Sequence, residues 1–481
     1  ACSDEIFNQS TITHKLMRRN IILFLATLVA SIAFGATPKY IFYFIGDGMG
    51  MAPVMAAVAY NRAVYGQPNL PLMMTFPVAG QVSTYSASSP VTDSAAAGTA
   101  LATGKKTANG MLGVTPDTVA VVSIASVLKD NGYGVGLVTN VAPDDATPGA
   151  FYAHVANRGM RPEVDRDFAS SGFDFLAGSA LNGLKKKGKP TDVLDIYREK
   201  GIRVINGYDE YLADKPAGGR VVLLDRNPFQ DGNTGYMIDS IPGMITLEQM
   251  TGACLAHLKT VSPDKFFMMV EGGNIDHALH GNDGATAISE IFNFNNALRI
   301  AYDFMLQHPD ETLIVVTADH DTGGMSTGCE ATGYNAHFDL YTNQKVSKEM
   351  FSDICKKVIA TDSAYTWDDM KAYLENNFGF WKGVKLSDKE TEQLHNLFTE
   401  VFERGHGEDK KGLYNNFNAF ADKVFSVMST KAGAGWTTPH HTGNPVPVYA
   451  AGPGSEIFGC FQDNTEIPRK IARLAGYSLP E

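Results

Sequence analysis

The chain has 481 residues, of which 44% are hydrophobic and 19% are charged, and its formal net charge is −12. This is the composition of a globular protein, long enough for one large α/β domain with an insertion or for two domains. The acidic balance, with no evident basic face, argues against nucleic-acid binding through phosphate contacts.

The N-terminal region has the organisation of a secretory signal peptide over residues 15–36. Basic residues precede an apolar run from Ile21 to Phe34, and small residues then allow cleavage after Gly35. The run is too short to cross a membrane as a helix. Met17 resembles a true start, so residues 1–16 are expected to be an upstream extension. We therefore expect an exported protein, either periplasmic in a bacterium or secreted.

The first strand expected in the mature chain is Tyr40–Ile45, which is apolar at every position and so typical of a strand buried on both faces. It leads to Asp47, which glycines flank. Open α/β sheets place their chemistry at such strand ends, although Asp and Gly also favour ordinary tight turns.

A serine at the start of an expected helix is the first candidate for chemistry. Ser94 heads an alanine-rich run that Thr92 or Asp93 can cap. A serine there lies at the positive end of the helix dipole, which favours a phosphate dianion and an ionised serine oxygen. Taken alone, the same pattern also fits an ordinary helix cap, and neighbouring motifs decide between the two.

A second acidic group follows a strand expected over residues 134–139. This segment contains Asp145 and the hydroxyl residue Thr147. Pro148 suits the first turn of a helix, which we predict to run toward Arg158. A straight helix would separate Thr147 from Arg158 by roughly 16 Å along its axis. Both can serve one site only if Arg158 reaches back with its long side chain.

Three further strands are predicted next to acids or histidines. Phe266–Val270 leads into a segment with Glu271, Asp276, His277 and His280; Leu313–Thr317 leads into Asp319 and His320; and Val446–Ala451 follows His440 and His441. Asp276 and His280 are four residues apart, so one helical turn would direct both to the same side. Repetition at several strand ends is hard to explain by turns alone.

The ligand types at these strand ends point to metals. Carboxylate with imidazole suits zinc, and carboxylate with hydroxyl suits magnesium. No G-x-S-x-G motif surrounds Ser94, which argues against a serine-hydrolase nucleophile elbow. A serine beside several metals instead indicates phosphoryl transfer, in which metals activate the nucleophile and neutralise the phosphoryl oxygens.

The alternation of strands and helices predicts an α/β fold with a central, mostly parallel sheet flanked by helices on both faces. Further expected elements are helices over 123–131, 247–258, 285–306 and 466–475, and a strand over 219–225. The composition changes between about 341 and 435, where amphipathic patterns predict a helical cap inserted into a domain that spans 36–481. Cys254, Cys329, Cys355 and Cys460 could pair in an exported chain, but their spacing does not indicate partners.

Taken together, these motifs resemble the alkaline phosphatase family over most of residues 38–480, apart from the insertion. The matching motifs are Asp47, D-S-A at Asp93–Ala95, D-A-T-P at Asp145–Pro148 with Arg158 beyond it, E-G-x-x-I-D-x-x-x-H at Glu271–His280, T-A-D-H at Thr317–His320 and H-T-G at His441–Gly443. Each motif alone is weak, and the set is very specific.

The resemblance implies two zinc ions, one magnesium ion and a phosphoserine intermediate. It implies that Asp276, His280 and His441 hold the first zinc; Asp47, Asp319 and His320, with Ser94, hold the second; and Asp47, Thr147 and Glu271 hold magnesium. Asp145 and His277 would lie behind these ligands, and family members differ at the His277 position. His441 is preferred to His440 as the ligand because it belongs to H-T-G.

The implied reaction is hydrolysis of phosphate monoesters, with Ser94 as nucleophile and Arg158 binding two phosphoryl oxygens, in an enzyme expected to be a homodimer. Two alternatives stay open. One is a phosphodiesterase or sulfatase of the same superfamily, although no C-x-P-x-R or S-x-P-x-R sulfatase signature occurs. The other is a secreted metal-binding or adhesion module, which would need neither Ser94 nor Arg158.

Overall fold

The computed structural model describes residues 37–67, 69–229, 233–361, 364–411 and 416–480. The signal peptide and upstream extension expected before residue 37 therefore lie outside the described residues. Within the ranges described, no helix is both long and apolar enough to cross a membrane.

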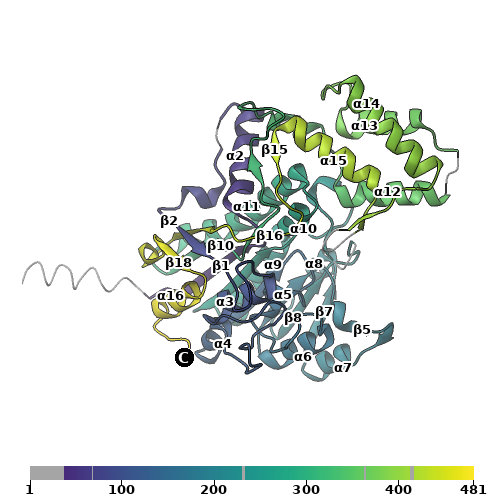
Figure 1. Cartoon of the computed structure of the whole chain (residues 1–481). Helices are drawn as coiled ribbons and strands as arrows, with labels where there is room; N and C mark the ends of the chain where they lie inside the picture. Colours follow the sequence, from purple (N-terminus) through teal and green to yellow (C-terminus); the bar gives the residue numbers. More distant parts are fainter. Residues whose placement is uncertain (1–36, 68, 230–232, 362–363, 412–415, 481) are drawn as a thin grey trace, which may run out of the picture.

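A ten-stranded sheet forms the centre of the molecule (Figure 1). Its strands, in spatial order, are β18 (Phe461–Asp463), β2 (Val78–Ser83), β17 (Val446–Ala451), β10 (Thr312–Ala318), β1 (Tyr40–Gly46), β9 (Phe266–Gly272), β3 (Gly134–Thr139), β4 (Phe175–Gly178), β8 (Arg220–Leu224) and β7 (Ile202–Asn206). β17 is antiparallel to both of its neighbours, and the other strand pairs of this sheet are parallel. The predicted mostly parallel α/β sheet is confirmed.

The three central strands are mostly apolar, as their sequences predict, and every residue in them is buried, including Glu271 near the end of β9. They pair in parallel, and their register places Gly46 of β1 beside Gly272 of β9 and Ala318 of β10. The acidic segments that follow these strands therefore begin at the same edge of the sheet, which is where ligands bind in open α/β folds.

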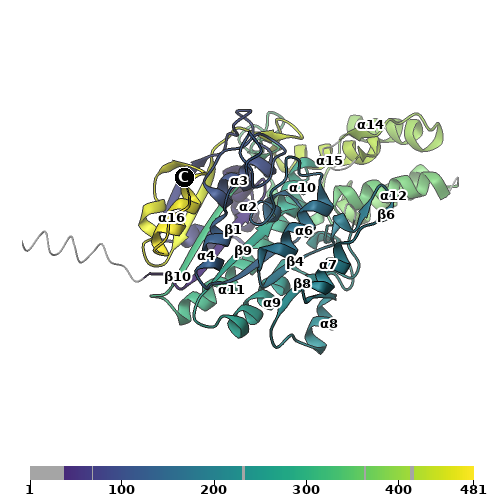
Figure 2. The same ribbon diagram turned by 90° about the horizontal axis from the view of Figure 1, so that it is seen from below.

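Helices cover both faces of the sheet (Figure 2). They are α2 (Met51–Tyr65), α3 (Ser94–Thr103), α4 (Ile124–Asp130), α5 (Ala146–Gly149), α6 (Arg161–Ser171), α7 (Val193–Glu199), α8 (Tyr208–Ala213), α9 (Leu247–Val261), α10 (Asn274–His280), α11 (Gly284–Gln307) and α16 (Glu466–Leu474). α9 packs closely on β3 because β3 carries glycine where the helix approaches. A Cβ atom at Gly136 would lie 2.3 Å from Cys254 Sγ.

The long helix predicted from Pro148 toward Arg158 is wrong. α5 ends at Gly149, and the chain then turns back, because its backbone groups find partners in an earlier loop. Leu112 and Val155 exchange two backbone hydrogen bonds, and the Arg158 N–H donates to the Gly110 carbonyl oxygen. The expected separation along a helix axis therefore does not exist.

The segment between residues 341 and 435 is largely helical. It contains α12 (Lys348–Thr361), α13 (Trp367–Phe378), α14 (Asp388–Phe398) and α15 (Ala419–Ala432), which project together from one side of the sheet (Figure 1 and Figure 2). Their core is rich in aromatic rings, including Phe351 and Phe420. The four cysteines of the described chain are all unpaired.

Candidate active site

The candidate nucleophile is the first residue of α3. Asp93 is the N-cap of this helix, since its Oδ1 accepts a hydrogen bond from the Ala96 N–H at 3.0 Å. The other oxygen, Oδ2, accepts from the Gly110 N–H at 3.0 Å. Asp93 thus fixes the start of the helix, and Ser94 Oγ lies 3.1 Å from His320 Nε2, buried at the positive end of the helix dipole.

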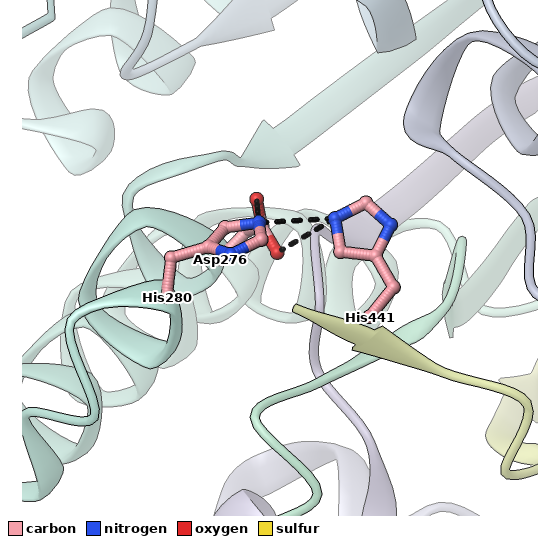
Figure 3. Close-up of side chains that lie close together, drawn as sticks. All are labelled: Asp276, His280 and His441. Carbon is pink, nitrogen blue, oxygen red and sulfur yellow. Dashed lines mark hydrogen bonds and ion pairs between the residues drawn. The ribbon is translucent and has the colours of Figure 1, made fainter. Parts of the chain in front are cut away.

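Asp276, His280 and His441 form a compact group that could hold a metal ion (Figure 3). The Nε2 atoms of the two histidines are 3.0 Å apart, and His280 Nε2 is 3.2 Å from Asp276 Oδ2. Each histidine places its Nδ1 on a backbone carbonyl oxygen, of Pro439 at 2.6 Å and of Thr92 at 2.9 Å.

These carbonyl contacts determine which ring nitrogens carry protons. A carbonyl only accepts, so each Nδ1 is the donor. Burial lowers the pKa of His441 to about 4, so its ring is neutral and its Nε2 presents a lone pair. That lone pair points into a space shared with His280 Nε2 and the Asp276 carboxylate, an arrangement that a cation would stabilise.

A second group lies at the end of β1 and β10. His320 Nε2 is 3.1 Å from Asp319 Oδ2 and 3.4 Å from Asp47 Oδ1. Burial, together with the charges of Asp319 and Asp276, raises the pKa of Asp47 well above its ordinary value. Asp47, Asp276 and His320 also place one ligand atom each within 4.8 Å of one another, so the two groups are contiguous through Asp276.

Gly48 allows this close approach. Its φ of +67° is in the left-handed region, and a Cβ there would lie 2.6 Å from Asp276 Oδ1. Its N–H donates to Asp319 Oδ1 at 3.1 Å. The glycines around Asp47 therefore serve the packing of the site as well as the turn.

The third group consists of oxygen ligands. Glu271, the sixth residue of β9, accepts a hydrogen bond from Thr139 Oγ1 of β3, and burial raises its pKa to about 8. Thr147, in α5, lies against it and acts to lower that pKa. Glu271 also contributes to the raised pKa of Asp47, which places all three residues predicted to bind magnesium in one neighbourhood.

Arg158 reaches the site despite its distance along the chain. Its Nη2 is 2.8 Å from Asp145 Oδ1 and its Nη1 is 3.6 Å from Asp93 Oδ2, so it lies next to the start of α3. His277 is buried, and its Nδ1 is 2.7 Å from Asn233 Nδ2. Burial lowers the pKa of His277 to about 4.

The structure brings together every residue that the sequence placed at the site. It leaves His440, the neighbour of His441, outside this group. His440 is exposed, whereas His441 lies in the short strand β16 (His441–Thr442), which pairs with β11 (Asp321–Thr322). In this register His441 is opposite Thr322, so the short ribbon sets the position of the candidate ligand.

Sequence reasoning missed Thr322. Its hydroxyl donates to Asp276 Oδ1 and lies 3.2 Å from His320 Nδ1, so it links the two candidate zinc groups. It follows Asp321, which itself follows the T-A-D-H motif. Nothing in the sequence distinguishes a threonine at this position from an ordinary strand residue.

A mostly parallel sheet with a serine, an arginine and clusters of carboxylates and imidazoles gathered at one edge defines an α/β enzyme with a candidate metal centre. Comparison with known proteins names the family. A family model described as alkaline phosphatase matches residues 38–172 and 174–477. The chain belongs to the alkaline phosphatase family, which confirms the resemblance found in the sequence.

Individual proteins similar to this chain are also alkaline phosphatases. The chain is 29% identical to alkaline phosphatase 3 of Bacillus subtilis (strain 168), over 92% of the chain and 90% of the relative. It is 29% identical to the solved structure of a cold-active alkaline phosphatase from a psychrophilic Shewanella species, with a TM-score of 0.76, covering 92% of the chain and 100% of that structure. A variant of the alkaline phosphatase TAB5, at 24% identity and a TM-score of 0.62, covers 92% of the chain and 99% of that structure, which has Mg bound in its M3 site.

Proposed function

We propose that this enzyme hydrolyses phosphate monoesters to an alcohol and inorganic phosphate through a phosphoserine formed on Ser94. The observation that carries the proposal is the position of Ser94 Oγ at the start of α3, 3.1 Å from His320 Nε2 and among buried carboxylates. Arg158, nearby, supplies a guanidinium for the phosphoryl oxygens.

Unpaired buried oxygens support a metal centre at this place. Asp47 Oδ1, Asp276 Oδ2 and Asp319 Oδ2 are buried carboxylate oxygens, and none of them accepts a hydrogen bond within the described part of the chain. Buried carboxylates without donors are costly unless a cation compensates them. The donor set therefore fits metals.

The ligand chemistry suggests which metals bind where. We propose that Asp276, His280 and His441 hold one zinc, that Asp47, Asp319, His320 and Ser94 hold the second, and that Asp47, Thr147 and Glu271 hold magnesium. Nitrogen and carboxylate donors suit zinc, and the all-oxygen set suits magnesium. The magnesium bound in the related TAB5 structure is consistent with the third site.

When bound, these ions would lower the pKa of nearby hydroxyl groups and neutralise charge on phosphoryl oxygens. The residues of the chain do the rest. Arg158 binds and orients the phosphoryl group with two parallel N–H donors. Ser94 Oγ forms a bond to phosphorus while the bond to the ester oxygen breaks, and the alcohol leaves with a proton. Water then cleaves the serine–phosphate bond and releases inorganic phosphate.

The test is the fate of Ser94. Replacing Ser94 with alanine should lower turnover of a monoester by on the order of 10³-fold or more, because no nucleophile remains. Acid-quenched wild type should carry one phosphoryl group on the Ser94 peptide by mass spectrometry. Ser170→Ala, on the exposed side of α6, is the matched control. Wild-type turnover in Ser94→Ala would refute the nucleophile assignment.

The alternatives give different results in the same assay. Comparison of a monoester, a diester and a sulfate ester separates a phosphatase from a diesterase or sulfatase, because we expect the monoester to be turned over fastest. A metal-binding or adhesion module would turn over none of them, and Ser94→Ala and Arg158→Ala would then change nothing.

We also propose that the mature protein is exported and forms a homodimer, and that residues 341–435 are a helical insertion in one domain spanning 36–481. The helices that project from the sheet support the insertion. N-terminal sequencing of the protein recovered from the host's periplasm or medium tests export, and light scattering of the purified protein tests the dimer. Retention of the full-length N-terminus in the cytoplasm, or a monomeric mass, would contradict them.

A further inference from the structure

A second arginine lies behind the first, in contact with the same carboxylate. Arg161 is the first residue of α6, and its Nη2 is 2.9 Å from Asp145 Oδ1, the atom that also accepts from Arg158 Nη2 at 2.8 Å. The Ala146 N–H donates to this oxygen as well, at 2.7 Å. One carboxylate oxygen thus receives three donors, two of which are positively charged.

The charges in this region alternate in space. Asp93 lies 3.6 Å from Arg158, Arg158 contacts Asp145, Asp145 contacts Arg161, and Arg161 lies 3.8 Å from Asp144. We refer to these five residues as the charge ladder. Burial would raise the pKa of Asp145, but the charges of Arg161 and Arg158 outweigh it and hold that pKa below its ordinary value.

Helix stability does not account for Arg161. A positive charge at the first residue of a helix interacts unfavourably with the helix dipole, which favours acids there. The guanidinium is instead held by the turn before α5, since its Nη1 donates to the Asp144 carbonyl oxygen. Asp144 is itself fixed, because its fully buried carboxylate accepts from the Gly183 N–H at 2.8 Å.

We propose that Arg161 is a positioning residue that neutralises Asp145 and so leaves the Arg158 guanidinium available to the phosphoryl group. Without Arg161, Arg158 would lie between two carboxylates, Asp93 and Asp145, with no other arginine in the ladder to balance them. These two carboxylates would then largely compensate the charge of Arg158, and the guanidinium would attract the phosphoryl group less strongly. The inference rests on the proposed function, in which Arg158 binds phosphate.

The experiment measures binding of inorganic phosphate to the metal-loaded enzyme, by calorimetry and by competitive inhibition, in Arg161→Gln and Arg161→Lys. Arg161→Gln keeps donors but removes the charge, and we expect phosphate to bind about tenfold more weakly, as for the loss of one charge-assisted contact. Arg161→Lys retains the charge and should recover most of the affinity. Arg166→Ala is the control, because Arg166 lies on the same helix and pairs with Asp192 at the surface.

A double-mutant cycle with Asp145→Asn isolates the mechanism. If Arg161 acts by neutralising Asp145, its replacement should change phosphate affinity little once Asp145 carries no charge. These titrations are made at saturating zinc and magnesium, and metal content is measured for each variant. A merely structural role would lower thermal stability in both backgrounds and would not depend on the charge at position 145.

Three results would overturn the proposal. Wild-type phosphate affinity in Arg161→Gln, with affinity lost in Arg158→Ala, would reject the role of Arg161 and leave the proposed function intact. A full Arg161→Gln effect in the Asp145→Asn background would mean that Arg161 contacts phosphate directly. Wild-type phosphate affinity in Arg158→Ala would instead remove the proposed phosphate-binding role of Arg158, on which the inference depends.

Discussion

Replacing Thr322 with valine removes one hydroxyl group and almost no volume. This hydroxyl has a single proton, which it donates to Asp276 Oδ1, so toward His320 Nδ1, 3.2 Å away, it acts as an acceptor. Nδ1 of His320 therefore carries a proton, which leaves Nε2, the nitrogen that faces Ser94 and Asp47, as the one able to bind a metal. Thr322 is fully buried, so water does not replace the lost hydrogen bonds.

Groups that orient metal ligands in this way typically contribute 10- to 100-fold to metal affinity, or about 1.4–2.8 kcal/mol. Because the hydroxyl touches both candidate zinc groups, we expect Thr322→Val to raise the free zinc concentration for half-maximal activity by about that factor. Saturating zinc should restore most of the turnover.

The assay strips the enzyme with a chelator and titrates zinc in a metal buffer, following both activity and bound zinc. Thr327→Val, in an exposed short strand five residues further on, is the isosteric control. A zinc titration of Thr322→Val that superimposes on the wild type would refute the reasoning, because it would mean that neither Asp276 nor His320 depends on this hydroxyl for its orientation toward a metal.

Three further predictions concern the metals and pH. His441→Ala should lose one zinc per chain and most activity, whereas replacement of the exposed His440 with alanine should leave both zinc ions bound. Metal analysis of the two variants tests this, and the opposite pattern would show that His440 is the ligand. Exhaustive chelation should abolish activity and lower the midpoint of thermal unfolding, because cations bind the folded state preferentially; full activity without metal would refute the metal centre. Burial raises the pKa of Glu290 from 4.5 to about 7. Between these two pH values the folded state retains a proton that the unfolded state releases. The contribution of Glu290 to the free energy of unfolding is therefore fully present below pH 4.5 and is lost as the pH rises through 7. Glu290→Gln removes the ionisable group, so the difference in unfolding midpoint between this variant and the wild type should move in favour of the variant from about pH 5 to about pH 8. An equal difference at both pH values would contradict the shifted pKa.

The central strands were predictable because a strand buried on both faces must be apolar throughout. Tyr40–Ile45 and Phe266–Val270 satisfy this over their whole length, and the structure extends each by only one or two residues. The shorter strands β4 and β7 were not predicted. β4 has four residues, and exposed positions interrupt β7, so neither carries a long apolar run.

The residues of the site were found through local motifs, whereas the path of the chain between them was not. Arg158 illustrates the difference. Its approach to Asp145 depends on the backbone pairing of Leu112 with Val155, which are 43 positions apart, and such a pairing leaves no periodic pattern in either segment. A proline in the first turn of α5 correctly indicated a helix, but the length of that helix is decided by these distant partners.

The same limit applies to the residues that orient the ligands. Asp321 Oδ2 accepts from Thr442 Oγ1 at 2.6 Å, and this contact supports the ribbon that sets His441 opposite Thr322. Aspartate and threonine are ordinary residues for a turn or a short strand, so their types predict nothing specific here. Arg161 is equally ordinary in sequence, and only its contact with the carboxylate that Arg158 also uses distinguishes it. Ligands are constrained by the chemistry of the metal and so recur as motifs, whereas an orienting group needs only one donor or acceptor in the right place, which many residue types can supply from many positions.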